Sequence, residues 1–330
     1  MRVEPEALLR ELADGEPHSG AELAREFGVT RAAIWKTMQK LAHWGLDVGA
    51  VPGVGYRLAR PIDLLDAREL RRTLAPQTVR RLARLEVFTE LDSTNRRLLA
   101  SEPPRRGELA ACLAEYQTAG RGRRGRRWLA PLGAGLCLSA GWQFEGAPRD
   151  LSALTLAVGV IARRALASAA ALDVALKWPN DLAIDERKLG GILLELAAEA
   201  QGRCYVVAGI GINFALPPES LGALSDWPRG AIDLRTAMRG SPPPRLDVAA
   251  RLLDGLADLF ASYAETGFAP YRAEWQAADY LNGRRVKLDD PAAPASGTAR
   301  GIDAHGALLI ETASGARRRV ISGDVSMRSA

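Results

Sequence analysis

The central part of the chain contains the stretch LKWPNDLAIDERKLGGILLELAAEAQGRCYVVAGIGIN, residues 176–213. Apolar runs alternate here with turn residues, which predicts strands at 174–178, 191–196 and 204–212. Small and polar residues stand near the strand ends, namely Lys177, Asn180, Asp181, Gly190 and Asn213. Because strands of one sheet bring such ends together, we expect a small-molecule pocket there.

The neighbouring sequence extends this sheet into a larger α/β region that starts after a linker at Pro61. Residues 151–169 are strongly apolar, interrupted chiefly by Arg163 and Arg164, and predict a buried helix. Three further strands are predicted at 85–88, 108–116 and 135–144. Two helices that close the domain are predicted at 246–263 and 268–277. The Pro- and Gly-rich segment 214–230 is predicted to be a loop.

Residues 1–60 predict three helices and a hairpin. Thr30 can cap a third helix that runs from Arg31 to about Trp44, and Gly45 ends it. This order is typical of a winged helix, whose third helix enters the major groove of DNA. The outward positions of that helix are Arg31, Trp35, Lys36, Gln39 and Lys40.

The charge of the first sixty residues leaves two interpretations open. Eight cations and eight anions balance over residues 1–60, so only the third helix is locally basic. A neutral domain with one basic helix predicts modest affinity for DNA per monomer, which a dimer would raise. The alternative is a protein-interaction module with a solvated basic face.

The last fifty residues predict short strands separated by glycine turns, which indicates a small barrel. The chain is therefore expected to be an α+β multidomain protein. Its predicted units are a winged helix-turn-helix at 1–60, a mixed α/β domain at 61–278 and a barrel at 279–330.

The segment GRGRRGRRW, residues 120–128, is the most distinctive in the chain, with five arginines between 121 and 127. It matches the dinucleotide pattern GxGxxG, but Arg-Arg-Trp-Leu-Ala-Pro follows it in place of a helix. A glycine-flexed cationic loop is suited to a polyanion, either nucleotide phosphates or a nucleic-acid backbone. The alternative is a solvated basic turn.

The choice of cations singles out two lysines. The 330 residues carry 44 Lys and Arg against 39 Asp and Glu, and only five of the cations are lysines. Lys177 and Lys188 both lie next to the predicted pocket, where a compact ammonium differs from a planar guanidinium. Three scattered cysteines and no signal-like N-terminus favour a cytoplasmic protein without disulfides or membrane attachment.

Several catalytic patterns are missing from the sequence. The three histidines are far apart, and neither HExxH nor GxSxG occurs. We therefore expect no metal held by the protein alone. An enzyme of this composition would act by positioning and charge stabilisation, as phosphoryl and adenylyl transferases do.

Several motifs together resemble biotin–protein ligase. They are Ser93-Thr94-Asn95, Glu115-Tyr116-Gln117, GRGRRGRRW, KWPND at 177–181 and RKLGGILLE at 187–195. The segments SGAELAREFGVTRAAIWK and PGVGYRL resemble the winged helix of the bifunctional form, which is also the biotin operon repressor. RGIDAHGALLIE at 300–311 resembles the SH3-like domain of that family, and the family's central domain is a class II synthetase-like sheet.

The resemblance implies two half-reactions. Biotin carboxylate attacks the α-phosphate of ATP, which is bound with Mg²⁺, and gives biotinyl-5′-AMP and pyrophosphate. A lysine of the biotin carboxyl carrier protein then takes the biotinyl group. Because a carboxylate and a triphosphate repel each other, such a site requires cations where they meet.

The resemblance also implies roles for individual residues. Lys188 and Arg123 would be catalytic, with Lys188 on the reacting groups and Arg123 on the mixed anhydride. The implied biotin and adenylate site comprises Ser93, Thr94, Asn95, Gln117, Gly120, Arg121, Gly122, Arg123, Trp128, Lys177, Asn180, Asp181, Lys188, Gly190 and Asn213. The segments 121–128 and 214–230 are expected to close over the intermediate.

In bifunctional relatives the adenylate promotes a homodimer that binds operator DNA. Trp35 departs from the small polar residue expected on the third helix, so the operator sequence is expected to differ from that of such relatives. Two alternative functions are compatible with parts of this pattern. A lipoate ligase would lack the GRGRRGRRW loop and the appended barrel, and a non-catalytic ligand-sensing transcription factor would not need Lys188 and Arg123.

Overall fold

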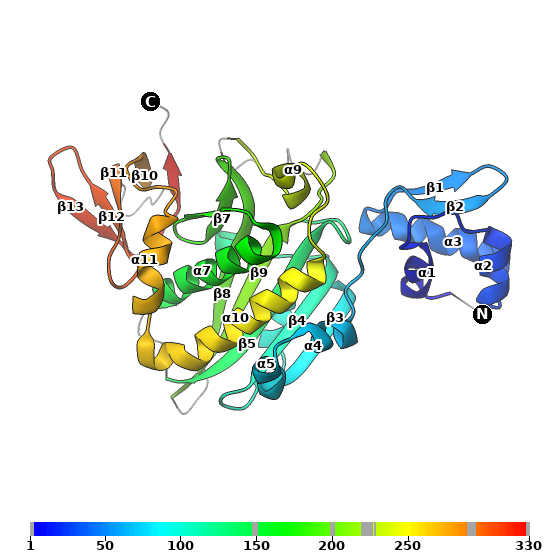
Figure 1. The fold of residues 1–330 in the computed structure, drawn as a ribbon, viewed down its shortest axis with the longest axis horizontal. Coiled ribbons are helices and arrows are strands. Elements are labelled where there is room, and N and C mark those ends of the chain that lie inside the picture. Colours follow the sequence, from blue (N-terminus) through cyan, green and yellow to red (C-terminus); the bar gives the residue numbers. More distant parts are fainter. Residues whose placement is uncertain are drawn as a thin grey trace.

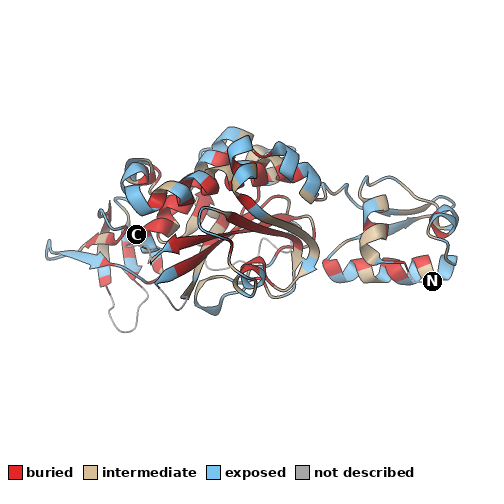
Figure 2. Ribbon diagram, turned by 90° about the horizontal axis from the view of Figure 1, so that it is seen from below, coloured by how far each residue is buried: buried red, intermediate tan, exposed pale blue. Residues whose placement is uncertain are grey.

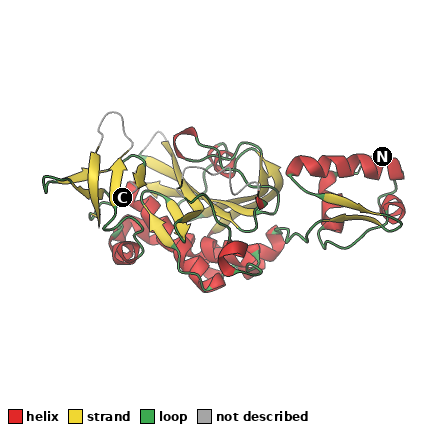
Figure 3. Cartoon of the chain, turned by 90° about the horizontal axis from the view of Figure 1, so that it is seen from above, coloured by secondary structure: helices red, strands yellow, loops and turns green. Residues whose placement is uncertain are grey.

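The computed structural model describes residues 3–146, 151–198, 202–218, 227, 229–288 and 295–327. Three sheets, of two, seven and five strands, organise the chain. They lie in a row, with the two-stranded sheet and the N-terminus at one end and the five-stranded sheet at the other (Figures 1 and 3). The expected fold class is confirmed.

The N-terminal unit consists of three helices and a hairpin, as predicted. Ser19 and Thr30 cap the second and third helices by accepting the backbone N–H groups of Ala21 and Ala33. The third helix is shorter than predicted, because a 3₁₀ turn replaces its last residues before Gly45 takes a φ of 76°. The elements are α1 Pro5–Leu12, α2 Gly20–Glu26, α3 Arg31–Leu41, the 3₁₀ turn Ala42–Trp44, β1 Val48–Val51 and β2 Gly55–Leu58.

The central sheet has the strand order β3-β4-β5-β9-β8-β7-β6. Strands β3 and β4 are parallel, and every other neighbouring pair is antiparallel. Its strands are β3 Leu82–Leu91, β4 Leu109–Gln117, β5 Gly135–Glu145, β6 Ala175–Lys177, β7 Asp181–Ile184, β8 Arg187–Ala198 and β9 Arg203–Asn213. The sequence did not indicate β7, which forms a tight hairpin with β6 around the KWPND turn.

Helices cover the two faces of this sheet unequally. The helices of the central region are α4 Ala67–Thr73, α5 Pro76–Arg81, α6 Thr94–Leu99, α7 Leu151–Ala170, α9 Leu234–Met238, α10 Arg245–Thr266 and α11 Ala269–Ala277. Helices α4, α7, α10 and α11 share the main core with one sheet face, and Figure 2 shows the buried strands beneath them. Helix α6 packs on the other face in a smaller core.

Helix α7 is the one helix of the described residues that is long and apolar enough to cross a membrane by length and composition. Two observations show that the apolar residues of this helix belong to the protein core. Of its most apolar window, 67% is buried in the structure. The helix also packs against α10, α11 and β8. It is the buried helix that the sequence predicted at 151–169.

The C-terminal unit is a five-stranded antiparallel sheet with the order β13-β12-β11-β10-β14. Its strands are β10 Arg285–Leu288, β11 Ala295–Ile302, β12 Leu308–Glu311, β13 Arg317–Val320 and β14 Val325–Met327. The buried indole of Trp178 donates to the carbonyl of Gly306 at 3.0 Å and so ties this unit to the central sheet.

The N-terminal unit rests on two strands of the central sheet. The indole of Trp44 donates to Glu90 Oε2 on β3 at 2.5 Å, and its carbonyl accepts the N–H of Leu132 at 3.0 Å. The ring of His43 lies edge-on to Tyr116 on β4, with 6.3 Å between centroids. Leu132 also belongs to the apolar core of the N-terminal unit.

A buried ion pair joins the linker to the central sheet. Arg245 Nη1 lies 2.7 Å from Glu115 Oε2, and both side chains are 4% exposed. Arg245 also donates to the carbonyl of Gly135 at 3.1 Å, while Glu115 Oε1 accepts the N–H of Leu65 at 2.5 Å. The pair is therefore satisfied on both sides, as a buried charge requires.

We expect Arg245→Leu to destabilise the protein by about 3–5 kcal/mol, because it leaves the Glu115 carboxylate buried without a counter-charge. Urea unfolding followed by fluorescence measures the change. The matched control is Arg300→Leu, which breaks a half-exposed pair with Glu311 and should cost at most about 1 kcal/mol. Equal losses in the two variants would contradict the assignment, and Arg245→Leu/Glu115→Leu should recover part of the stability.

Candidate active site

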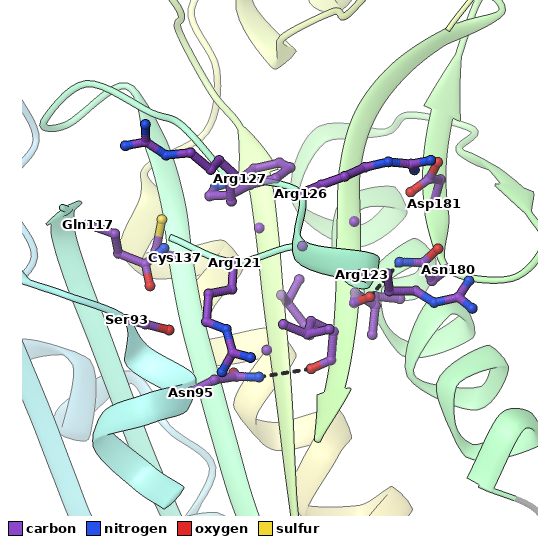
Figure 4. Close-up of a pocket in the computed structure, with 18 of the residues that line it drawn as sticks. Ser93, Asn95, Gln117, Arg121, Arg123, Arg126, Arg127, Cys137, Asn180 and Asp181 are labelled. Atoms are coloured by element: carbon purple, nitrogen blue, oxygen red, sulfur yellow. Dashed lines mark hydrogen bonds between the residues drawn. The ribbon is translucent and has the colours of Figure 1, made fainter. Parts of the chain in front are cut away.

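A pocket opens on the α6 face of the central sheet, between α6, the loop after β4 and the strands β8 and β9 (Figure 4). Residues far apart in sequence line it together. They are Ser93, Thr94, Asn95, Gln117, Arg121, Gly122, Arg123, Arg126, Arg127, Trp128, Cys137, Asn180, Asp181, Lys188, Gly191, Ile192, Leu193, Gly209, Ile210, Gly211 and Trp227.

Glycines on β9 form the floor of the pocket. Gly209 and Gly211 are two apart and so point to the same face of the strand. A Cβ at Gly209 would lie 2.2 Å from Asn95 Oδ1, and one at Gly211 would lie 2.4 Å from the Trp128 ring. The bare strand face therefore lets Asn95 and Trp128 pack directly on the sheet backbone.

The wall beside α6 is a chain of hydrogen bonds. Gln117 Oε1 accepts the N–H of Thr94 at 2.8 Å. The hydroxyl of Ser139 lies 2.6 Å from Asn95 Oδ1 and 2.7 Å from Thr94 Oγ1. Ser93 caps α6 and is 2% exposed. These buried polar groups hold one another in fixed orientations around the pocket.

The arginine loop, residues 120–128, is a compact turn. Arg121 and Arg127 form an antiparallel bridge, and the N–H of Gly122 donates to the carbonyl of Arg126 at 2.7 Å. Arg124 has a φ of 54° and Gly125 a φ of 75°, which turns the chain within a short 3₁₀ segment. The N–H of Trp128 then donates to the Gly120 carbonyl at 2.9 Å and closes the base of the loop.

Carboxylates lie beside the arginines of this loop. Arg121 Nη1 is 2.8 Å from Glu195 Oε1 on β8. Asp324, just before β14, lies 2.7 Å from Arg126, 3.7 Å from Arg124 and 3.8 Å from Arg123. Burial lowers the pKa of Arg123, and the charge of Asp324 acts in the opposite direction.

Lys188 projects from β8 into the pocket beside a carboxylate. Its Nζ lies 2.8 Å from Asp181 Oδ1, and the indole of Trp227 donates to Asp181 Oδ2 at 3.0 Å. The ammonium of Lys177 lies 4.1 Å from the centroid of the Trp227 ring. Burial lowers the pKa of Lys177, and this cation–π contact compensates part of its lost hydration.

Four residues of the predicted site lie next to the pocket and do not line it. Gly120 closes the loop, and Lys177 packs on Trp227 as described above. A Cβ at Gly190 would lie 2.5 Å from the Gly211 carbonyl, so this glycine permits close strand packing. Asn213 is fully buried and donates to the carbonyls of Lys188 and Ile232 at 3.4 and 3.1 Å.

The predicted DNA-contacting residues share the outer side of α3. Ile34, Met38 and Leu41 are buried on its inner side. The predicted outer residues are exposed or half-buried, and Trp35 is 56% exposed. They are Arg31, Trp35, Lys36, Gln39 and Lys40.

Several lining residues were not singled out from the sequence. Arg126 and Arg127 were expected only as part of the arginine loop, and Gly209 and Gly211 only as part of a strand end beside the pocket. Cys137 lies on β5 opposite Gly211, and burial raises the pKa of its thiol to about 11. Trp227 comes from the predicted loop 214–230, of which residues 219–226 and 228 lie outside the described part.

Family models match three parts of the chain. Residues 87–213 match the biotin/lipoate A/B protein ligase family, and residues 282–328 match the biotin protein ligase C-terminal domain. Residues 6–57 match a helix-turn-helix domain.

Relatives match along nearly the whole length. The chain is 40% identical to the bifunctional ligase/repressor BirA of Escherichia coli strain K12, over 99% of this chain and 98% of that protein. It is 29% identical to BirA of Bacillus subtilis strain 168, over 96% and 95%. Among solved structures, the biotin protein ligase of Aquifex aeolicus in complex with biotin and ATP is similar, with 28% identity, a TM-score of 0.61 and coverage of 76% and 99%.

We expect Gly211→Ala to push Trp128 off the sheet and to expose Cys137 beneath it. All three cysteines are buried, so thiol reagents should label the unaltered protein slowly. Mass spectrometry of the alkylated peptides should show faster labelling of Cys137 in the variant. Gly49→Ala is the control, because nothing lies within 4 Å of its added Cβ. Labelling of Cys137 at the control's rate would refute the packing role of Gly211.

Proposed function

Because the chain belongs to the biotin protein ligase family and matches its bifunctional ligase/repressor members end to end, we propose that it is both a biotin ligase and a biotin-responsive repressor. The proposed enzyme is a biotin–[biotin carboxyl carrier protein] ligase that uses ATP. The observation that carries this proposal is the convergence of Lys188, the arginine loop and the polar wall at Thr94 and Asn95 on one pocket.

In the first half-reaction, a carboxylate oxygen of biotin attacks the α-phosphorus of ATP. The new bond gives biotinyl-5′-AMP, and the bond to pyrophosphate breaks. Lys188 is proposed to stand between the two anions, where its ammonium reduces their repulsion and stabilises the charge that develops on phosphorus. Arg123, half-buried and beside the pocket, is proposed to hold the phosphate of the mixed anhydride.

The neutral bicyclic end of biotin is proposed to lie against the polar wall and the glycine floor. Thr94, Asn95 and Gln117 supply fixed donors and acceptors there, and the missing side chains of Gly209 and Gly211 let Asn95 and Trp128 lie close to the sheet beside them. Trp128, whose ring packs against Gly211, is proposed to support the adenylate.

Magnesium is proposed to enter with ATP, where it neutralises phosphate charge. The described residues contain no group of three or more His, Cys, Asp or Glu side chains that could hold a metal alone. Asp181 and Asn180 line the pocket and carry the oxygen ligands that Mg²⁺ prefers, so the residues fit a metal that substrate phosphates also coordinate.

In the second half-reaction, the amine of a carrier-protein lysine attacks the biotinyl carbonyl. An amide forms, the bond to phosphate breaks and AMP leaves. Arg121 and the rest of the arginine loop are proposed to close over the intermediate until the carrier docks.

Repression is proposed to use α3, whose outer side carries Arg31, Lys36 and Lys40. Since residues 1–60 are neutral overall, one copy offers few phosphate contacts. We therefore propose that the adenylate favours a homodimer through the central sheet, and that two winged helices bind one operator. The proposed units are 1–60, 61–278 and 279–330, with the cytoplasm as the compartment.

We expect Lys188→Ala to lower biotin-dependent ATP–pyrophosphate exchange about 10²–10³-fold, the usual cost of one group that stabilises transition-state charge. Lys287→Ala, which removes an exposed lysine of β10 that does not line the pocket, is the control and should keep its exchange rate. The same assay with lipoate in place of biotin separates the two ligase classes. An unchanged exchange rate in Lys188→Ala would refute the catalytic role of Lys188. Exchange that occurs with lipoate and not with biotin would refute the proposal that biotin is the substrate.

We expect Lys36→Ala to weaken operator binding and to reduce the slope of log K against log salt by about 1. Fluorescence anisotropy with labelled operator DNA, with and without biotin and ATP, measures both quantities. Glu22→Gln is the control, because Glu22 lies on α2 and contributes no cation. An unchanged salt slope would indicate that α3 does not face the phosphates.

A further inference from the structure

One carboxylate at the edge of the pocket holds two of its walls at once. Glu195 lies on β8, two residues beyond Leu193, which lines the pocket. Its Oε2 accepts Asn95 Nδ2 at 2.8 Å, and its Oε1 lies 2.8 Å from Arg121 Nη1. The side chain is only 19% exposed, so neither contact is fully screened by water.

The hydrogen bond from Asn95 to Glu195 determines the orientation of the Asn95 side-chain amide. A carboxylate only accepts hydrogen bonds, so the NH₂ group of Asn95 must point to Glu195, where it also meets the Leu193 carbonyl at 3.1 Å. The amide oxygen then faces Ser139, whose hydroxyl donates at 2.6 Å. The same Ser139 hydroxyl lies 2.7 Å from Thr94 Oγ1, and the Thr94 hydroxyl in turn donates to Gln117 Oε1 at 3.2 Å.

The contact with Arg121 holds the arginine loop over the pocket. Arg121 is the first arginine of the loop and pairs with Arg127 across it. Its side chain is 44% exposed and points toward Asn95 from above (Figure 4). The loop and the wall thus meet at the same carboxylate, although they are separate in sequence.

We propose that Glu195 is a positioning residue for biotin. It fixes the donor and acceptor pattern of the wall through Asn95 and holds the loop closed through Arg121. This inference rests on the biotin ligase function proposed above. Glu195 is not among the residues that line the pocket, so we expect its loss to affect retention of biotin and of its adenylate more than the chemical step.

A rival interpretation gives Glu195 the opposite effect on ATP. In this interpretation Glu195 pairs with Arg121 only until a phosphate of ATP replaces the carboxylate. Removal of the carboxylate would then leave the Arg121 guanidinium available to the nucleotide. The Michaelis constant for ATP would then fall, whereas our proposal leaves it unchanged and raises the constant for biotin.

The test is Glu195→Gln in the full-length protein. Glutamine has the same side-chain shape as glutamate, but only one of its two terminal atoms can accept a hydrogen bond, so it cannot accept from both Asn95 and Arg121. We expect the KM for biotin in ATP–pyrophosphate exchange to rise at least about tenfold, as loss of a hydrogen bond to a charged group does. The kcat and the KM for ATP should stay unchanged, and the adenylate should dissociate faster. Glu311→Gln is the control, since it removes a Glu–Arg pair in the C-terminal sheet.

A second pair of variants tests whether the two residues act together. Arg121→Gln should also raise the KM for biotin, and Glu195→Gln/Arg121→Gln should be no worse than the stronger single change. Additive losses, an unchanged KM for biotin, a lower KM for ATP or a fall in kcat and melting temperature alone would each overturn the proposal. Absence of biotin-dependent exchange in the unaltered protein would instead refute the ligase function itself.

Discussion

Positive charge in the pocket is balanced by carboxylates that come from three separate parts of the chain. Asp181 on β7 pairs with Lys188, Glu195 on β8 pairs with Arg121, and Asp324 before β14 lies among three arginines of the loop. Cations gathered for two anionic substrates repel one another when the site holds none. The acidic partners let the cations stay preorganised, and preorganised charge is what lowers the barrier of an adenylyl transfer.

The same strands that form the pocket carry the N-terminal unit. Glu90 on β3 holds Trp44, and Ser93 of the pocket wall follows three residues later. Tyr116 on β4 packs against the N-terminal core, directly before Gln117, which binds Thr94. The N-terminal unit therefore rests on β3 and β4, the two strands whose ends lead into the pocket.

Much of the local structure followed from sequence patterns. Thr30 marked the start of the third helix, and the strongly apolar segment 151–169 became α7 in the core. Short elements were missed, namely α4, α5, α9, β7 and β14, because three to seven residues carry too little periodicity to distinguish them from loops. Helix α4, for example, exposes Arg68, Arg71 and Arg72 and buries only Leu70.

The sequence by itself determined the order of the three units, the arginine loop and the polar strand ends, because capping, periodicity and motif spacing act over a few residues. It could not determine that Glu195 meets both Asn95 and Arg121, or that Asp324 reaches the loop from about two hundred residues away. Trp227 likewise had no local signal for its place beside Asp181. Such contacts depend on strand register and on the docking of distant segments, which no local pattern encodes.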